Sequence, residues 1–320
     1  MLPKVFIDGH TGTTGLRIHQ WMADRNDIEL LTLPEELRRD AEERRGQILE
    51  SDVAVLCLPD DAAEEVAGWV EEADTRLIDA STAHRVAEGW TYGLPELEPG
   101  QRAAIHDSKL VSNPGCYPSA FILLVRPLVD AGLLPEDAPI SINALSGYSG
   151  GGNSLIGKWE NPENGLDALP FEAPYALYQR HKHIPEMMKF ARISAEPQFV
   201  PAVGPFRCGM RVQVPVHASM LKSGATGEQV WEALYDRYLG EQFVEVAHLQ
   251  EAGALNELSY NPEVCNDSNR IQLHVAPHPS GHVLLIALLD NLGKGACGAA
   301  IQNLNLMLGF EEGAGLPNSL

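Results

Sequence analysis

The first 120 residues alternate short apolar runs with amphipathic segments, a pattern typical of a parallel sheet with crossover helices. The run at 52–58, DVAVLCL, is almost continuously apolar, as expected of a strand that is buried on both faces. Residues 16–25 place Ile18, Trp21 and Met22 at helical spacing on one face. Further strands are predicted at 4–7, 28–33, 77–79 and 109–111.

The pattern changes near residue 140, where an apolar strand runs into the glycine-rich loop SGYSGGG. Residues 153–205 are rich in Pro, Gly, Asn and Glu and predict irregular connections. Strands are predicted at 211–216, 270–275 and 282–289, and helices at 118–134, 228–239 and 295–308. The fold class is therefore an α/β first half followed by an α+β second half, with a final helix that packs back on the first half.

Composition and charge narrow the classes of function. The chain has 320 residues, of which 44% are hydrophobic, and it carries a formal net charge of −21. That charge opposes binding to nucleic acid or to an anionic membrane, and a small anionic ligand would require a locally cationic pocket. No apolar run approaches the ~20 residues that span a bilayer, and the first residues lack the long apolar core of a signal peptide. We therefore expect a cytoplasmic protein that binds small molecules.

The five cysteines are dispersed without any C-x-x-C spacing, so neither a disulfide framework nor a metal site is expected. Cys57 in an apolar strand and Cys297 in a helix of small residues are typical core positions. Cys116 differs, because N-P-G before it and Y-P after it form a constrained turn ahead of an apolar helix. A helix N-terminus favours the thiolate, and Asn113 with nearby backbone N–H groups could hold an oxyanion. Cys116 is therefore the candidate nucleophile.

A glycine motif, G-x-x-G-x-x-G, lies between the first predicted strand and the first predicted helix. Glycines at this junction permit a tight turn and allow backbone N–H groups to approach a pyrophosphate. The motif predicts a dinucleotide site that includes Gly9, Thr11, Gly12, Thr13, Thr14 and Gly15.

The segment after the second predicted strand bears on which dinucleotide is bound. An acidic residue near this point would bind the ribose of NAD, and Glu35 and Glu36 are candidates. Arg38 and Arg39 are the alternative, because a guanidinium can pair with the 2′-phosphate of NADP(H). We favour NADP(H).

Several further motifs identify a family resemblance. The chain carries GHTGTTG at 9–15, YGLPEL at 92–97, SNPGCYP at 112–118, SGYSG at 146–150, HKHIPE at 181–186 and DNLGKGA at 290–296. Together and in this order they resemble the N-acetyl-γ-glutamyl-phosphate reductases, within the aspartate-semialdehyde dehydrogenase superfamily, and the opening resembles the compact branch. One segment departs from the longer members, which have D-x-S-A-D-F-R where this chain has DASTAHR at 79–85.

The resemblance implies NADPH-dependent reduction of N-acetyl-L-glutamyl 5-phosphate to the 5-semialdehyde through a cysteine thioester, with release of phosphate, in arginine biosynthesis. It also implies a Rossmann-like NADP-binding domain at 1–117, completed by 290–320, and an α+β catalytic and dimerisation domain at 118–289. The expected partners are the acyl phosphate, phosphate and further copies of the chain, in a dimer or tetramer. Cofactor contacts are expected from Ser149, Gly150, Asn291 and Lys294, the last of which lies between glycines and is not expected in the core. Substrate contacts are expected from Asn113, Arg85, His181 and Arg207.

The proton-transfer residue is predicted to be His183 rather than His181. Pro185 is expected to favour extended geometry before it, which would point both imidazoles the same way. Glu186 could then orient the His183 ring, as a third group does in other nucleophile–base pairs. His181, flanked by two cationic residues, better suits binding of an anionic group.

Two other classes of function remain at this point. Aspartate-semialdehyde dehydrogenase, or a reductase of the lysine pathway, would use the same thioester chemistry. A non-catalytic nucleotide-binding regulator could keep the glycine loop without a nucleophile, although the joint presence of Cys116, the histidine motif and Lys294 argues against it.

Overall fold

A computed structural model describes residues 1–166, 168–249 and 257–317, and the chain divides into two units. Of these residues, unit 1 contains 1–115 and 296–317, and unit 2 contains 116–166, 168–249 and 257–295. The chain therefore passes from one unit to the other between Gly115 and Cys116, and returns between Gly295 and Ala296. In the described part of the chain, no helix is both long enough and apolar enough to cross a membrane.

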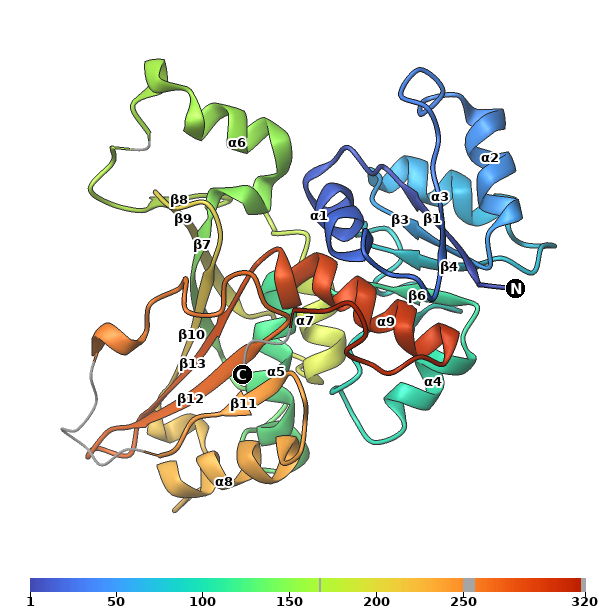
Figure 1. Cartoon of the computed structure of the whole chain (residues 1–320). Helices are drawn as coiled ribbons and strands as arrows, with labels where there is room; N and C mark the ends of the chain where they lie inside the picture. Colours follow the sequence, from blue (N-terminus) through green and yellow to red (C-terminus); the bar gives the residue numbers. More distant parts are fainter. Residues whose placement is uncertain (167, 250–256, 318–320) are drawn as a thin grey trace. The chain divides into compact units, whose positions relative to one another are not determined.

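Unit 1 is built on a fully parallel sheet with the strand order β2-β1-β3-β4-β6-β5 (Figure 1). These strands are β1 (Lys4–Asp8), β2 (Glu29–Leu31), β3 (Val53–Leu56), β4 (Arg76–Asp79), β5 (Thr91–Tyr92) and β6 (Leu110–Ser112). The connecting helices are α1 (Thr13–Met22), α2 (Ala41–Glu50), α3 (Asp60–Trp69) and α4 (Gln101–Asp107). Parallel strands need such crossover helices, and the predicted α/β architecture of the first half is confirmed.

Helices cover both faces of this sheet. Phe6 of β1 and Leu56 of β3 pack with Ile48 of α2 and Val66 of α3 in one apolar cluster. Successive side chains of a strand point to opposite faces, so the alternate positions of β1 and β3 face the other layer. There α9 (Gly298–Leu308) contacts α1, α4 and β4, which confirms that the final helix packs on the first half (Figure 1).

Unit 2 contains a mixed sheet with the order β11-β12-β13-β10-β7-β9-β8. Its strands are β7 (Ser141–Gly147), β8 (Ala173–Pro174), β9 (Gln198–Gly204), β10 (Met210–Val216), β11 (Val244–Val246), β12 (Ile271–Pro277) and β13 (Val283–Leu289). The helices α5 (Cys116–Asp130), α7 (Ile184–Ala191) and α8 (Gly227–Tyr238) pack together, and α5 and α8 also contact the sheet. The elements α6 (Gly152–Glu160), η1 (Tyr148–Gly151), η2 (Pro162–Asn164), η3 (Ala218–Met220) and η4 (Glu257–Ser259) lie in the connections.

Helix α5 is apolar on all sides, as expected of a buried helix, and has a proline in its interior. Pro127 has no N–H to donate to the carbonyl of Leu123, four residues earlier. The Tyr238 hydroxyl of α8 donates to that carbonyl at 2.8 Å. This bond satisfies a buried acceptor and joins α8 to α5.

Several sequence predictions are wrong in detail. Residues 153–205 are not mainly irregular, because they contain α6, α7 and β9. Helix α7 was hidden by Pro185, which lies in the first turn, where a helix has no N–H bond to lose. The final helix also differs, since a π-helical turn, η5 (Gly293–Cys297), precedes α9.

Candidate active site

The glycine loop of unit 1 has the backbone geometry of a nucleotide-binding turn. Gly9 has a φ of +86°, and a Cβ there would lie 2.4 Å from the carbonyl oxygen of Cys57. A Cβ on Gly15 would lie 2.4 Å from the carbonyl oxygen of Gly9. Gly12, the N-cap of α1, has no side chain to cap the first N–H groups, and the first turn contains no acidic residue. The N-terminus of α1 therefore suits a phosphate group.

A cation lies beside this loop. The Arg38 guanidinium donates to Thr11 Oγ1 at 2.9 Å and also pairs with Glu35 at 2.5 Å. Arg39 is exposed. The structure therefore brings Arg38, rather than both arginines, against the glycine loop.

The end of β1 carries a carboxylate that sequence reasoning missed. Asp8 is 3% exposed and accepts two hydrogen bonds from Arg44, from Nη2 at 2.7 Å and from Nε at 3.0 Å. Because this pairing neutralises Asp8, the carboxylate does not oppose a phosphate at the adjacent turn. Arg44 could not be identified from the sequence, since it lies 36 residues from Asp8 on an otherwise charged helix.

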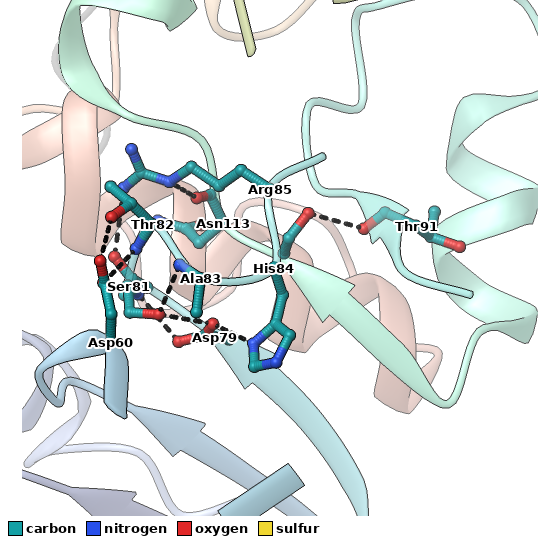
Figure 2. Close-up of polar contacts among 11 residues, drawn as sticks. Asp60, Asp79, Ser81, Thr82, Ala83, His84, Arg85, Thr91 and Asn113 are labelled. Carbon is teal, nitrogen blue, oxygen red and sulfur yellow. Dashed lines mark hydrogen bonds and ion pairs between the residues drawn. The ribbon is translucent and has the colours of Figure 1, made fainter. Parts of the chain in front are cut away.

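The segment that departs from the longer family members forms a buried polar network at the end of β4 (Figure 2). Asp79 is fully buried, and its carboxylate accepts a hydrogen bond from Ser81 Oγ at 2.7 Å. The Nδ1 atom of His84 is hydrogen-bonded to the same carboxylate, also at 2.7 Å. The His84 ring stacks on Trp90 with centroids 4.0 Å apart. Arg85 donates to the carbonyls of Asn113 and Ala80, so it is tied to the strand ends.

Asn113 is 1% exposed, and its side chain is engaged within unit 1. Its Nδ2 donates to the carbonyl of Ala296 at 2.9 Å, and its Oδ1 accepts from Asn303 at 3.2 Å. The amide thus holds the end of β6 to α9. It does not stand open toward a ligand, as the expected oxyanion contact would require.

Cys116 is the first residue of α5 and is half-buried. A Cβ on Gly295 would lie 2.7 Å from the Cys116 Cβ, so only glycine permits this approach. At the N-terminus of a 15-residue helix the dipole favours a thiolate. The Cys116 thiol is therefore accessible to a substrate, and its thiolate form is stabilised by the helix dipole, as a nucleophile requires.

The other thiols are less suited to nucleophilic chemistry. Burial raises the pKa of Cys57 to about 12 and that of Cys265 to about 11. Cys297 is fully buried, and Cys208 lies with its sulfur 3.4 Å from Ser149 Oγ. Cys208 is thus the remaining half-buried competitor in unit 2.

Aromatic and imidazole side chains gather around the residue that follows Cys116. The Tyr175 hydroxyl donates to the Tyr117 hydroxyl at 3.1 Å and lies 3.5 Å from His181 Nε2. His183 donates its backbone N–H to His181 Nδ1 at 3.2 Å. Phe199 packs edge-on against both Tyr117 and His181. The structure therefore brings the two predicted histidines together with the cysteine segment in unit 2.

The geometry of the histidine segment differs from the prediction. His183 is the N-cap of α7 with helical φ and ψ, so residues before Pro185 are not extended. Burial, followed by the Lys182 charge, lowers the pKa of His181 to about 4. His181 is therefore neutral at neutral pH, so it would contact an anion as a hydrogen-bond donor and not as a cation. His183 is 7% exposed and Glu186 is 1% exposed.

The loop after β7 is held by buried polar side chains. Asn291 Nδ2 donates to Ser149 Oγ at 2.9 Å, and Asn291 Oδ1 accepts from the Gly209 N–H at 2.8 Å. Ser149 and Asn291 are 1% and 2% exposed, whereas Gly150 is exposed. The side chains of Ser149 and Asn291 thus hold the loop in place. Among these three predicted cofactor residues, Gly150 is the one that is exposed to a ligand.

Two predicted contacts are placed differently. Lys294 is fully buried in η5, with Nζ 5.7 Å from the centroid of the Phe243 ring. The expectation that it lies outside the core is wrong, because the π-helical turn directs it inward. The Arg207 side chain is 60% exposed and pairs with Glu160 at 2.7 Å.

Sequence reasoning missed the two tyrosines. Tyr117 lies inside the cysteine motif and could have been singled out as a buried phenol next to the nucleophile. Tyr175 follows a proline in a stretch with no periodic pattern, so no local signal identifies it.

Comparison with known proteins agrees with this geometry. The family description "Semialdehyde dehydrogenase, NAD binding domain" matches residues 34–105, and "Semialdehyde dehydrogenase, dimerisation domain" matches residues 116–291. Aspartate semialdehyde dehydrogenase II of Vibrio cholerae is similar in fold, with a TM-score of 0.73, 18% identity, and coverage of 96% of this chain and 98% of that one. A Candida albicans aspartate semialdehyde dehydrogenase determined with NADP has a TM-score of 0.65 at 16% identity, covering 96% and 99% of the two chains.

Curated relatives are much closer in sequence. N-acetyl-gamma-glutamyl-phosphate reductase of Trichormus variabilis is 46% identical over 319 residues, covering 98% of this chain and 99% of that protein. N-acetyl-gamma-glutamyl-phosphate reductase 2 of Pseudomonas putida is 46% identical over 314 residues, with the same coverage. At this identity over nearly the whole length, and with a candidate nucleophile in the matched dimerisation domain, the chain belongs to the N-acetyl-gamma-glutamyl-phosphate reductase family of semialdehyde dehydrogenases.

Proposed function

We propose that the protein reduces N-acetyl-L-glutamyl 5-phosphate to N-acetyl-L-glutamate 5-semialdehyde with NADPH and releases phosphate, in arginine biosynthesis. The observation that carries the proposal is the half-buried Cys116 at the start of α5, beside the histidine and tyrosine cluster. The names of relatives that are 46% identical over 98% of the chain select this substrate.

Cys116 would act as the nucleophile. Its thiolate attacks the acyl carbon, the bond from that carbon to the phosphate oxygen breaks, and phosphate leaves from a thioester. NADPH supplies a hydride to the thioester carbon when bound. The resulting alkoxide collapses to the aldehyde, and the Cys116 sulfur leaves with the bonding electron pair.

His183 is the proposed acid–base residue. It caps α7, its ring centroid lies 5.9 Å from that of Tyr117, and Tyr117 directly follows the nucleophile. An imidazole can take the thiol proton and, near neutral pH, later return a proton to the Cys116 sulfur as the alkoxide collapses to the aldehyde. The Nδ1 atom of His181 already accepts the backbone N–H of His183, and burial lowers the pKa of His181 to about 4, so we assign the proton transfer to His183.

Residues of unit 1 fit the cofactor. The turn at Gly9 and the first N–H groups of α1 would hold the pyrophosphate, with Gly15 permitting the close packing. Arg38, already hydrogen-bonded to Thr11, is the proposed partner of the 2′-phosphate. Gly150 of unit 2 is exposed on a loop braced by Ser149 and Asn291, and we propose that it also contacts the cofactor.

We propose that Arg85 contacts the substrate. Arg207 is a weaker candidate for this role, because its side chain is exposed and pairs with Glu160.

We propose that unit 1 is the cofactor domain and that unit 2 is the catalytic and dimerisation domain of a cytoplasmic homo-oligomer. The match to a dimerisation domain supports the oligomer. So does one face of the mixed sheet, where Leu145 and Arg211 lie opposite each other on β7 and β10 and remain half-exposed.

A comparison of turnover with two semialdehyde substrates tests the proposal. The purified protein is given N-acetylglutamate semialdehyde or aspartate semialdehyde with NADP+ and phosphate, and NADPH formation is followed. We expect phosphate-dependent turnover with the acetylated substrate and a kcat/KM at least about 100-fold lower with aspartate semialdehyde, since the active site must accept a longer, acetylated chain. A preference for aspartate semialdehyde, or no turnover of either, would refute it.

A further inference from the structure

A chain of hydrogen bonds links the histidine segment to the residue after the nucleophile. His181 Nδ1 accepts the His183 N–H, so the ring proton of neutral His181 lies on Nε2, which faces Tyr175 Oη at 3.5 Å. Tyr175 donates to Tyr117 at 3.1 Å, and Tyr117 is hydrogen-bonded to the Ser146 side chain. Ser146 Oγ donates to the carbonyl of Gly147 at 3.1 Å. Hydroxyl contacts thus join Tyr175, Tyr117 and Ser146 to the ring of His181.

This chain joins three segments that carry the family motifs. Tyr117 belongs to the start of α5, His181 to the loop before α7, and Ser146 to the end of β7. Ser146 Oγ would lie 3.4 Å from a Cβ on Gly150, so the chain ends beside the exposed glycine loop. These segments are far apart in the sequence and meet through side-chain hydroxyls.

We propose that Tyr117 and Tyr175 are positioning residues of the reaction, which hold the Cys116 turn, the backbone of His183 and the Ser146–Gly150 loop in register. This role rests on the proposed function. Neither hydroxyl is needed for packing, because a phenylalanine would fill the same volume, at 117 against Phe199 and at 175 against the His181 ring. Tyr117 is 3% exposed and Tyr175 is half-buried, and a polar group in such a setting costs free energy unless it is hydrogen-bonded.

Both phenols remain protonated and able to donate at neutral pH. Burial raises the pKa of Tyr175 to about 12 and that of Tyr117 well above its usual value, and the Cys116 charge raises both further. The chain therefore persists when Cys116 is a thiolate.

Removal of single hydroxyls tests the role of the tyrosines. Tyr175→Phe and Tyr117→Phe should each lower kcat about 5- to 10-fold with KM changed less than twofold, while the melting temperature shows that the fold is intact. Tyr178→Phe is the matched control, because that side chain is fully exposed. Wild-type kcat in both Tyr175→Phe and Tyr117→Phe would overturn the proposal.

Two substitutions of His181 separate its hydrogen bond to the His183 backbone from its contact with the Tyr175 hydroxyl. His181→Gln places an amide N–H near the position of Nε2 and can donate to Tyr175, whereas His181→Asn places an oxygen near Nδ1 and keeps only the bond to His183. The proposal predicts that His181→Gln retains several-fold more kcat than His181→Asn, and that adding Tyr175→Phe removes the difference. Equal kcat in the two variants, or a higher kcat in His181→Asn, would contradict it.

The rate of Cys116 alkylation by iodoacetamide provides a readout that needs no substrate. Tyr117→Phe and Tyr175→Phe should change this rate severalfold at pH 7, and Tyr178→Phe should not. If the protein fails to reduce the acyl phosphate yet the alkylation rates respond, the proposed function fails and the positioning role stands. If activity is as proposed but neither kcat nor alkylation responds to the loss of the hydroxyls, the positioning role fails alone.

Discussion

Arg38 donates a hydrogen bond to Thr11 at 2.9 Å, and this contact places a cation beside the glycine loop of an otherwise strongly acidic protein. Arg38→Ala should raise the KM for NADPH about 10- to 100-fold, since a charge-assisted phosphate contact contributes ~1.5–3 kcal/mol. Steady-state kinetics with NADPH and NADH measures the effect, and the KM for NADH should change little. The exposed neighbour provides the control Arg39→Ala. Equal losses with both cofactors would show that Arg38 supports the loop and does not read the 2′-phosphate.

The buried neutral imidazole of His181 predicts a pH dependence of stability. Its pKa is about 4 in the folded protein and near the ordinary 6.5 in the unfolded chain. Between these values the unfolded state binds more protons, so the free energy of unfolding should fall as the pH drops from 6.5 toward 4. Urea unfolding at pH 7 and pH 5 measures it, and His181→Gln should lose less stability over this interval than the wild type. An identical loss in both proteins would contradict the assignment.

The Tyr238 hydroxyl compensates for a proline within α5. Tyr238→Phe leaves the buried carbonyl of Leu123 without this donor and should lower the free energy of unfolding by about 1–3 kcal/mol. Tyr235→Phe on the same helix is the control, because Tyr235 is half-buried and stacks on Trp231 through its ring. Denaturant unfolding compares the two variants, and similar stabilities would show that the bond to Leu123 contributes nothing.

The thiols should react in a defined order. Brief treatment of the native protein with iodoacetamide should label Cys116 first and Cys208 second, because both are half-buried and only Cys116 begins a helix. Cys265 and Cys297 are buried and should react only after unfolding, and the half-buried Cys57 should react slowly because its pKa is raised to about 12. Peptide mapping by mass spectrometry gives the order. Faster labelling of Cys208 than of Cys116 would contradict the claim that the N-terminus of α5 activates the Cys116 thiol.

The core of the fold could be predicted because its signal is local. The run at Val53–Leu56 is apolar throughout and lies between two parallel partners, and Gly15 is required by a contact with the Gly9 carbonyl within one turn. Helix α7 was missed because Pro185 ends a helix in most positions and begins one in this position.

The candidate site was only partly predictable. Cys116 is identified by its own flanking residues. The contacts of Tyr175 with Tyr117, and of Arg44 with Asp8, join positions 58 and 36 residues apart, and no spacing in the sequence indicates them. The neutral state of His181 likewise depends on burial that only the folded chain provides, whereas its neighbouring lysine suggests the opposite role.

The thioester on Cys116 is the central claim, and the reverse reaction without phosphate tests it most directly. Given N-acetylglutamate semialdehyde and NADP+ alone, the protein should form NADPH in a burst of about one equivalent per active chain, because the acyl group then has no acceptor. Mass spectrometry should find a single acyl adduct on Cys116, phosphate should discharge it, and Cys116→Ser should show neither burst nor adduct. Sustained phosphate-dependent turnover in Cys116→Ser, or an adduct confined to another residue, would contradict the account.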